Sequence, residues 1–155
     1  MTHASQEQFQ RETHFAARDL PQGIASGTFV MTDAGALPVD FLEPGMTVLT
    51  DDGPMTLRKV ETRRFSGPCV TVAAGALGPD LPDQALELPA HLEVRLPSSG
   101  ARVRLADIVD GVAFVPTQGL SLRLYRLHFD AETMVEAEGL SLPCTAARDG
   151  AAQAA

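Results

Sequence analysis

Apolar and polar positions alternate with a period of two through most of the chain, which predicts β-strands joined by tight turns. Residues 27–32 and 46–50 are two such runs, and each leads into a turn of the form Thr-Asp-x-Gly. Aspartate can hydrogen-bond its own backbone in a turn, and glycine supplies the positive φ of a bulged hairpin. Two hairpins in quick succession, each containing a turn glycine (Gly35 and Gly53), predict an all-β, antiparallel fold.

The run over residues 120–129 changes its alternation partway along. Its apolar side chains occupy one face at positions 120, 122 and 124, and then positions 125, 127 and 129. A slip of one residue in a period of two predicts a bulge or a sharp bend, such as a strand that passes between two sheets.

The chain also contains an internal echo. Residues 39–46 (VDFLEPGM) resemble residues 105–112 (LADIVDGV), which lie 66 positions later. Each copy follows a turn glycine and precedes an apolar strand. The shared order is strand, turn, strand, one helical turn, glycine and strand, which predicts two similar halves related by a pseudo-twofold axis.

The two ends differ in character from the middle. Residues 1–22 are polar and lack strand alternation, so we expect an N-terminal arm. Residues 23–143 form the predicted β domain, whose length suits a single core. Residues 144–155 are rich in alanine with nothing to bury, so we expect a disordered tail.

Composition narrows the classes of function. The chain carries 20 acidic against 12 basic residues and a net charge of −8, which argues against binding to nucleic acid or to anionic membranes. No apolar stretch reaches the length of a membrane span, and the N-terminus lacks a signal-peptide core, so the cytoplasm is the default expectation. The two cysteines, Cys69 and Cys144, are too few for a disulfide framework, and a buried free thiol is expected at Cys69.

Several stretches together resemble the Hedgehog/intein (Hint) domains, in particular their bacterial subfamily. The matching stretches, in order, are Gly27-Thr28, the run LPVxxLxPGMxVLT from Leu37, VAAGALG from Val72, LPAH at residues 88–91, Phe129-Asp130, and VxAEG from Val135. The resemblance covers roughly residues 23–143. It implies a curved, all-β, pseudo-twofold domain, in agreement with the echo and the bent strand.

The resemblance also implies a chemistry. In this family a Cys or Ser begins the domain and attacks the carbonyl carbon of the preceding residue, which converts the amide to a thioester or ester. A Thr-x-x-His element polarises that peptide bond, with its histidine as the acid–base group. In inteins a terminal Asn then releases the domain.

This chain departs from that pattern at most of the critical positions. Gly23 occupies the position of the nucleophile, and Leu88 replaces the Ser/Thr of the histidine motif, whereas His91 remains. In the C-terminal strand the family's histidine falls at Arg126, with His128 two residues on. The chain contains no Asn. We therefore regard His91 and His128 as vestigial catalytic residues and expect autoproteolysis to be lost.

Other arrangements of these residues are weaker. The hydroxyls of Ser26 and Thr28 lie near position 23, but several residues out of register. Cys69, His91, His128 and Cys144 are the residue types of a Cys2His2 zinc site, yet no preorganising C-x2-4-C or H-x3-5-H pair is present. Asp51-Asp52 and the pair Asp80 and Asp83 match no calcium-loop pattern. We expect neither a metal nor a cofactor.

Three functions remain open. The first is a degenerate Hint domain, catalytically silent and retained as a binding or structural module, whose protein partner the sequence does not identify. The second is an active self-processing enzyme with a non-standard nucleophile. The third is a β module that binds a small ligand or a metal in the cleft vacated by catalysis. The N-terminal arm, tethered at the former active site, is a further candidate to plug it.

Overall fold

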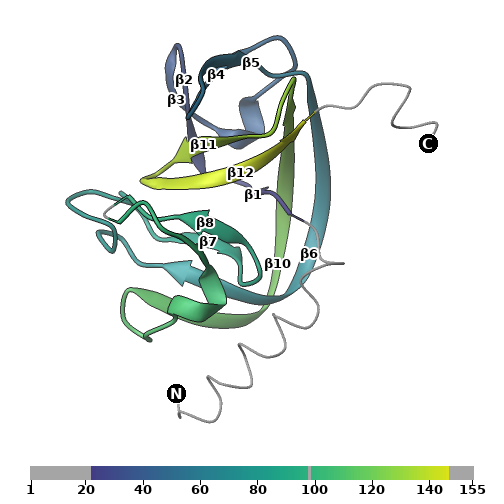
Figure 1. Cartoon of the computed structure of the whole chain (residues 1–155). Coiled ribbons are helices and arrows are strands. Elements are labelled where there is room, and N and C mark those ends of the chain that lie inside the picture. The colour runs from purple at the N-terminus through teal and green to yellow at the C-terminus, as the bar shows by residue number, and fades with distance from the viewer. Residues whose placement is uncertain (1–21, 98, 147–155) are drawn as a thin grey trace.

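The structure is a computed structural model, and it describes residues 22–97 and 99–146. Within that part the elements are twelve strands and two single-turn 3-10 helices (Figure 1). Their bounds are β1 (Ile24–Ala25), β2 (Phe29–Thr32), β3 (Gly35–Pro38), η1 (Val39–Phe41), β4 (Thr47–Thr50), β5 (Gly53–Thr56), β6 (Lys59–Val72), β7 (Leu86–Pro89), β8 (Glu93–Arg95), β9 (Arg102–Arg104), η2 (Leu105–Ile108), β10 (Phe114–Phe129), β11 (Thr133–Ala137) and β12 (Leu140–Ala146). The predicted all-β class is confirmed.

Both predicted hairpins are present, as β2–β3 and β4–β5. Thr32 pairs with Gly35 and Thr50 with Gly53, and each glycine has a positive φ (104° and 93°). The threonine hydroxyls close the turns: Thr32 Oγ1 donates to the carbonyl of Gly35 at 2.6 Å, and Thr50 Oγ1 donates to that of Gly53 at 2.7 Å. The turn positions were predicted correctly, but threonine performs the role that the sequence suggested for aspartate.

The two longest strands, β6 and β10, pair antiparallel and curve together along the whole molecule (Figure 1). The register shift in β10 lies between Thr117 and Leu120, so the prediction of an irregularity near residue 124 was wrong in position. Leu124 and Tyr125 are neighbours on β10 whose side chains lie on opposite faces, and both are buried; β1 pairs with β10 at these two residues, on the edge away from β6. The bend between two groups of strands is therefore real, and burial on both faces explains the altered alternation.

The internal echo corresponds to repeated structure. The segments 39–46 and 105–112 begin with η1 and η2, and each helix follows a short hairpin strand (β3 and β9). The first residue of each helix makes an equivalent backbone hydrogen bond to the residue just before the hairpin's first strand. The amide of Val39 donates to the carbonyl of Thr28 at 2.8 Å, and the amide of Leu105 donates to the carbonyl of Leu92 at 3.0 Å. The predicted pseudo-twofold halves are confirmed.

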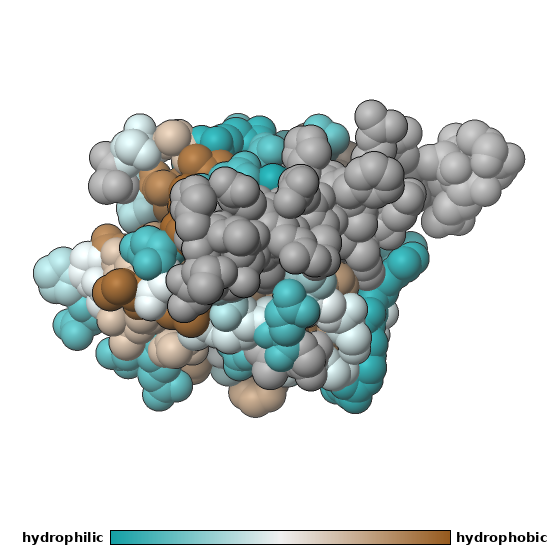
Figure 2. Space-filling view, turned by 90° about the horizontal axis from the view of Figure 1, so that it is seen from below, coloured by the Kyte–Doolittle hydropathy of each residue, from teal (hydrophilic) through white to brown (hydrophobic). Residues whose placement is uncertain are grey.

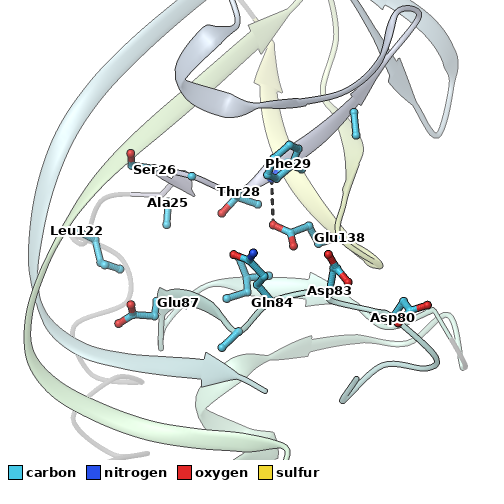
Figure 3. Close-up of a pocket in the computed structure, with 14 residues that line it drawn as sticks. Ala25, Ser26, Thr28, Phe29, Asp80, Asp83, Gln84, Glu87, Leu122 and Glu138 are labelled. Atoms are coloured by element: carbon cyan, nitrogen blue, oxygen red, sulfur yellow. Dashed lines mark hydrogen bonds between the residues drawn. The ribbon is translucent and has the colours of Figure 1, made fainter. Parts of the chain in front are cut away.

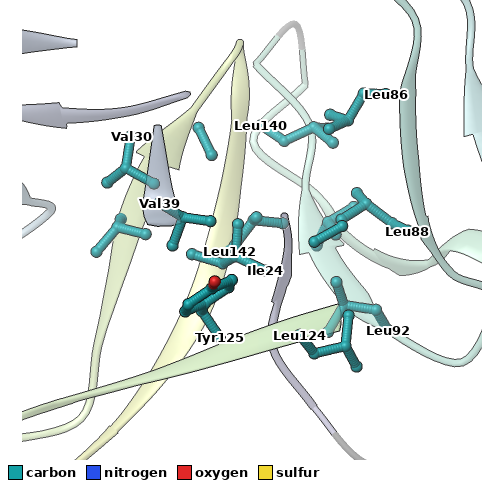
Figure 4. Close-up of a cluster of buried hydrophobic side chains, with 14 of the residues drawn as sticks. Ile24, Val30, Val39, Leu86, Leu88, Leu92, Leu124, Tyr125, Leu140 and Leu142 are labelled. Carbon is teal, nitrogen blue, oxygen red and sulfur yellow. The ribbon is translucent and has the colours of Figure 1, made fainter. Parts of the chain in front are cut away.

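The core is aliphatic, as the scarcity of aromatic residues requires. Part of it lies between the halves, where Ile24, Leu88, Leu92, Leu124 and Leu142 gather (Figure 4). In the view from below, hydrophobic residues collect towards the left of the visible surface and hydrophilic residues line its right edge (Figure 2). None of the helices described here has both the length and the apolar character to cross a membrane.

The described residues overlap the two expected terminal segments only in part. The final strand β12 continues to Ala146, so residues 144–146 belong to the sheet, and the rest of the expected tail lies outside the described residues. The expected N-terminal arm lies outside them too, apart from Gln22.

Candidate functional site

Gly23 is buried directly before β1, against the middle of β10. A Cβ on Gly23 would stand 3.0 Å from the Cβ of Leu124 and 3.1 Å from the carbonyl oxygen of Tyr125. Real Cβ atoms rarely tolerate such distances, and one of the two neighbours is backbone. A nucleophilic side chain at this position would therefore require Leu124 or the backbone of Tyr125 to move by a few tenths of an ångström.

Leu88, at the position of the motif's Ser/Thr, lies on β7 opposite Val70 of β6 and has no exposed surface. It belongs to the apolar group that includes Ile24 and Leu124, the residues beside Gly23 (Figure 4). An aliphatic side chain in these surroundings cannot donate a hydrogen bond to a peptide carbonyl. The residue that the sequence resemblance aligns with the family's polarising Ser/Thr is thus part of the hydrophobic core.

His91 follows β7 and is 3% exposed. Its ring meets that of Phe65 edge-on, with centroids 5.2 Å apart and an interplanar angle of 62°. Aromatic pairs favour this geometry, which packs the imidazole against the Phe65 ring on β6.

His128 lies elsewhere, in a hydrogen-bonded group at the far end of β10. Its Nε2 lies 2.6 Å from Glu61 Oε1, and its Nδ1 lies 2.7 Å from Thr145 Oγ1. Because a carboxylate only accepts, Nε2 donates to Glu61. This hydrogen bond is the largest cause of the lowered pKa of Glu61; burial opposes it, and coulombic contributions from Lys59, His128 and Arg126 lower it further.

The structure does not bring the two histidines together. Phe65, which contacts His91, pairs with Leu122 on β10, and His128 lies six residues further along that strand. Six residues of extended chain span roughly 20 Å. A shared catalytic role of His128 and His91 therefore has no geometric support. The side chain of His128 instead links β10 to β6 through Glu61 and to β12 through Thr145.

Neither thiol of the chain is arranged for nucleophilic attack. Burial, with a smaller contribution from Glu87, raises the pKa of Cys69 to about 11, and burial raises that of Cys144 to about 12. Both are free cysteines in buried positions, Cys69 on β6 and Cys144 on β12. A thiol must ionise to attack, so these two are inert at neutral pH.

The hydroxyl of Ser26 is held by Asp40. Asp40 Oδ2 accepts hydrogen bonds from Ser26 Oγ and, at 3.2 Å, from the Tyr125 hydroxyl, while Oδ1 accepts the Gly27 amide at 2.7 Å. Burial raises the pKa of Asp40, but these hydrogen bonds outweigh it and leave the pKa below its ordinary value. Such a carboxylate is a weak base, so it orients Ser26 without activating it.

A cleft lies between the segment after β1 and the segment that leads into β7. Its volume is about 550 Å³, within the usual range of ligand pockets. It is lined by Ala25, Ser26, Gly27, Thr28, Phe29, Ala36, Asp80, Asp83, Gln84, Ala85, Leu86, Glu87, Leu122 and Glu138 (Figure 3). Gly23 and His91 are not part of this lining.

Sequence reasoning considered Ser26, Thr28, Asp80 and Asp83 separately, but it did not bring them together in one cleft and it did not single out Gln84, Glu87 or Glu138 as site residues. Glu138 and Gly139 form the two-residue turn between β11 and β12, and Glu138 has a φ of 51°. Asn-Gly is the usual pair in such a turn. The signal available in the sequence was therefore a Glu-Gly pair between two apolar runs, with glutamate in place of the usual asparagine. Its Oε2 accepts the amide of Phe29 at 3.0 Å, which ties this turn to β2.

Metal-ligating residues do not converge in the described part of the chain, where no group of three or more His, Cys, Asp or Glu side chains could hold an ion. The four aspartates that were compared with calcium-loop patterns do not share one site. Asp51 pairs with Arg95, and Asp52 accepts the Thr133 hydroxyl at 2.7 Å, whereas Asp80 and Asp83 line the cleft.

Comparison with known proteins places the chain in a family. Residues 23–145 match the family described as Hint domain, and the match begins at Gly23. The chain therefore belongs to the Hint domain family, as its sequence resemblance predicted. A search of curated proteins returned no match.

Solved structures of inteins and an intein-like domain share the fold. A DnaB intein from Synechocystis superposes with a TM-score of 0.57 at 10% identity, covering 81% of this chain and 99% of its own. A bacterial intein-like domain from Clostridium thermocellum gives 0.56 at 11% identity, with coverage of 79% and 99%. The gp41-1 intein gives 0.55 at 11% identity, with coverage of 79% and 98%. At these identities the likeness concerns the fold alone.

Proposed function

We propose that this chain is a degenerate Hint domain that does not cleave itself and is retained as a binding module. The observation that carries the proposal is the crowding at Gly23, where the family match begins and where even a Cβ would press on Leu124 and Tyr125. An acyl shift requires a side-chain sulfur or oxygen at that position, and glycine supplies neither.

Two further features support the loss of cleavage. Leu88 fills the space of the polarising hydroxyl with buried hydrocarbon, so the peptide bond before Gly23 lacks that activating partner. Both thiols of the chain have raised pKa values, and the Ser26 hydroxyl is bound to Asp40. The alternative of a non-standard nucleophile finds no support among these groups.

The binding role is supported by the cleft, whose volume lies in the usual range of ligand pockets and whose lining carries several polar side chains. The test is direct. Purified full-length chain is incubated with dithiothreitol or with hydroxylamine, reagents that trap (thio)ester intermediates, and its intact mass is followed. We expect no fragment, whereas cleavage between Gln22 and Gly23 would refute the proposal.

A further inference from the structure

The cleft carries an unbalanced negative charge. Four of its lining residues are acidic (Asp80, Asp83, Glu87 and Glu138), and none of the residues that line it is Lys, Arg or His. Like charges around one cavity repel one another and focus a negative potential into it, which raises the local concentration of cations. An occupant with positive charge would relieve that repulsion.

A second and independent observation is the hydroxyl of Thr28. Thr28 is 1% exposed, and its Oγ1 has no hydrogen-bond partner. Figure 3 shows this hydroxyl directed into the space between β1–β2 and the segment that carries Gln84 and Glu87. A buried polar group left without a partner is destabilising, so the unliganded cleft lacks one hydrogen bond that a ligand could supply.

The carboxylates are spread around the cavity and do not converge on a point. In the part of the chain that the structure describes, no three acidic, histidine or cysteine side chains come close enough to hold a metal ion. Calcium and magnesium need about six or more oxygens around one centre. Besides the carboxylates, the lining includes apolar side chains, among them Ala25, Leu86 and Leu122. This combination suits a cation with an aliphatic stem.

We propose that the cleft binds an organic cation, a primary ammonium group on an aliphatic chain, attracted by the combined negative potential of Asp83, Glu87 and Glu138 and held by a hydrogen bond to Thr28. The proposal names the ligand class for the binding module proposed above and rests on that function. A free polyamine and a lysine side chain of a protein offer the same chemistry, and the experiment separates them.

The test is isothermal titration calorimetry on the full chain with three probes. These are spermidine, an acetylated and amidated tripeptide Gly-Lys-Gly, and the same peptide with norleucine in place of lysine. We expect spermidine, the lysine peptide or both to bind, and the norleucine peptide not to bind. Binding of spermidine alone identifies a free polyamine as the source, and binding of the lysine peptide alone identifies a protein segment.

Two pairs of charge-removing substitutions distinguish binding in the cleft from nonspecific attraction of cations to the acidic surface. Asp83→Asn/Glu87→Gln should raise the Kd by about tenfold or more, a loss of about 1.4 kcal/mol. Glu93→Gln/Glu136→Gln removes the same charge at exposed positions outside the cleft and should change the Kd less than about twofold. Equal losses in the two pairs would show general counterion attraction and overturn the proposal.

Thr28→Val tests the hydroxyl itself. Because Oγ1 has no partner in the unliganded protein, the isosteric change should leave the Tm unchanged or raise it, while the Kd rises about three- to tenfold. An unchanged Kd, or the absence of binding by either cationic probe, would overturn the proposal. Intact mass measured on the same samples reports cleavage independently, so a failure of the proposed function is seen separately from a failure of binding.

Discussion

A Cβ on Gly23 would lie 3.0 Å from the Cβ of Leu124. Gly23 directly precedes β1, and Leu124 lies on β10, the strand with which β1 pairs. This crowding is part of the fold's architecture, since Ile24 and Ala25 pair with Tyr125 and Leu124 on the next rungs. The start of the domain is thereby fixed against the long strand that joins its two halves. A glycine here permits a closer approach of β1 to β10 than any residue with a side chain would allow.

Restoring a thiol should therefore not restore cleavage. Gly23→Cys is expected to leave the chain intact in the presence of dithiothreitol, because the new side chain would be crowded by Leu124 and Tyr125 and the aliphatic Leu88 cannot donate a hydrogen bond to the preceding peptide. Mass spectrometry of the purified variant checks this. Fragments from Gly23→Cys would show that the rest of the catalytic apparatus is still competent.

The crowding can be measured separately through stability. Gly23→Ala should lower the free energy of unfolding by about 1–3 kcal/mol through overpacking, in addition to any backbone strain. Gly100→Ala is the matched control, since Gly100 also has a positive φ, 70°, but nothing lies within 4 Å of its Cβ position. Urea unfolding gives both values, and an equal or smaller loss for Gly23→Ala would contradict the close approach.

Asp40 predicts a pH dependence of stability. Its pKa in the folded chain lies below the ordinary 3.8, so its contribution is fully present above that value and is lost as the pH falls through the folded pKa. The unfolding free energy of the wild type should thus fall more steeply below about pH 4 than that of Asp40→Asn. Ser26→Ala, which removes one donor, should reduce the difference, and parallel curves for all three proteins would refute this role.

His128 is expected to stabilise the fold and not to act in chemistry. His128→Ala should cost about 1–3 kcal/mol, because Glu61 and Thr145 lose a partner. The pKa of Glu61, followed by NMR, should rise towards its ordinary 4.5. Lys59→Ala removes only a 3.8 Å contact with Glu61 and should move that pKa less. An equal or larger effect of Lys59→Ala would assign the lowering to charge alone.

The thiols give a prediction of reactivity. With pKa values of about 11 and about 12, Cys69 and Cys144 should both resist a disulfide reagent such as DTNB at pH 7.5 while the chain is folded. Both should react at once in strong denaturant. Rapid reaction of either cysteine in the native chain would reveal a thiolate that the described environment does not favour.

The sequence predicted what depends on local chemistry. The two Thr-Asp-x-Gly turns, at residues 32–35 and 50–53, located both hairpins. The internal echo located the helical turns η1 and η2. It missed what depends on distant segments meeting. The slip at residues 124 and 125 suggested a bulge, whereas both residues are buried in the core on opposite faces of β10, which one strand's pattern cannot reveal. Likewise, the cleft joins Thr28, Glu87 and Glu138 from three separate stretches.

The most direct measurement of the central claim is the intact mass of the full-length chain and of His91→Ala, after parallel incubation at neutral pH with and without hydroxylamine. Both proteins should remain at one mass, 16.4 kDa for the unmodified chain, under every condition. Release of residues 1–22 from the wild type, abolished by His91→Ala, would contradict the account, since it would demonstrate an acyl shift at Gly23 that depends on this imidazole.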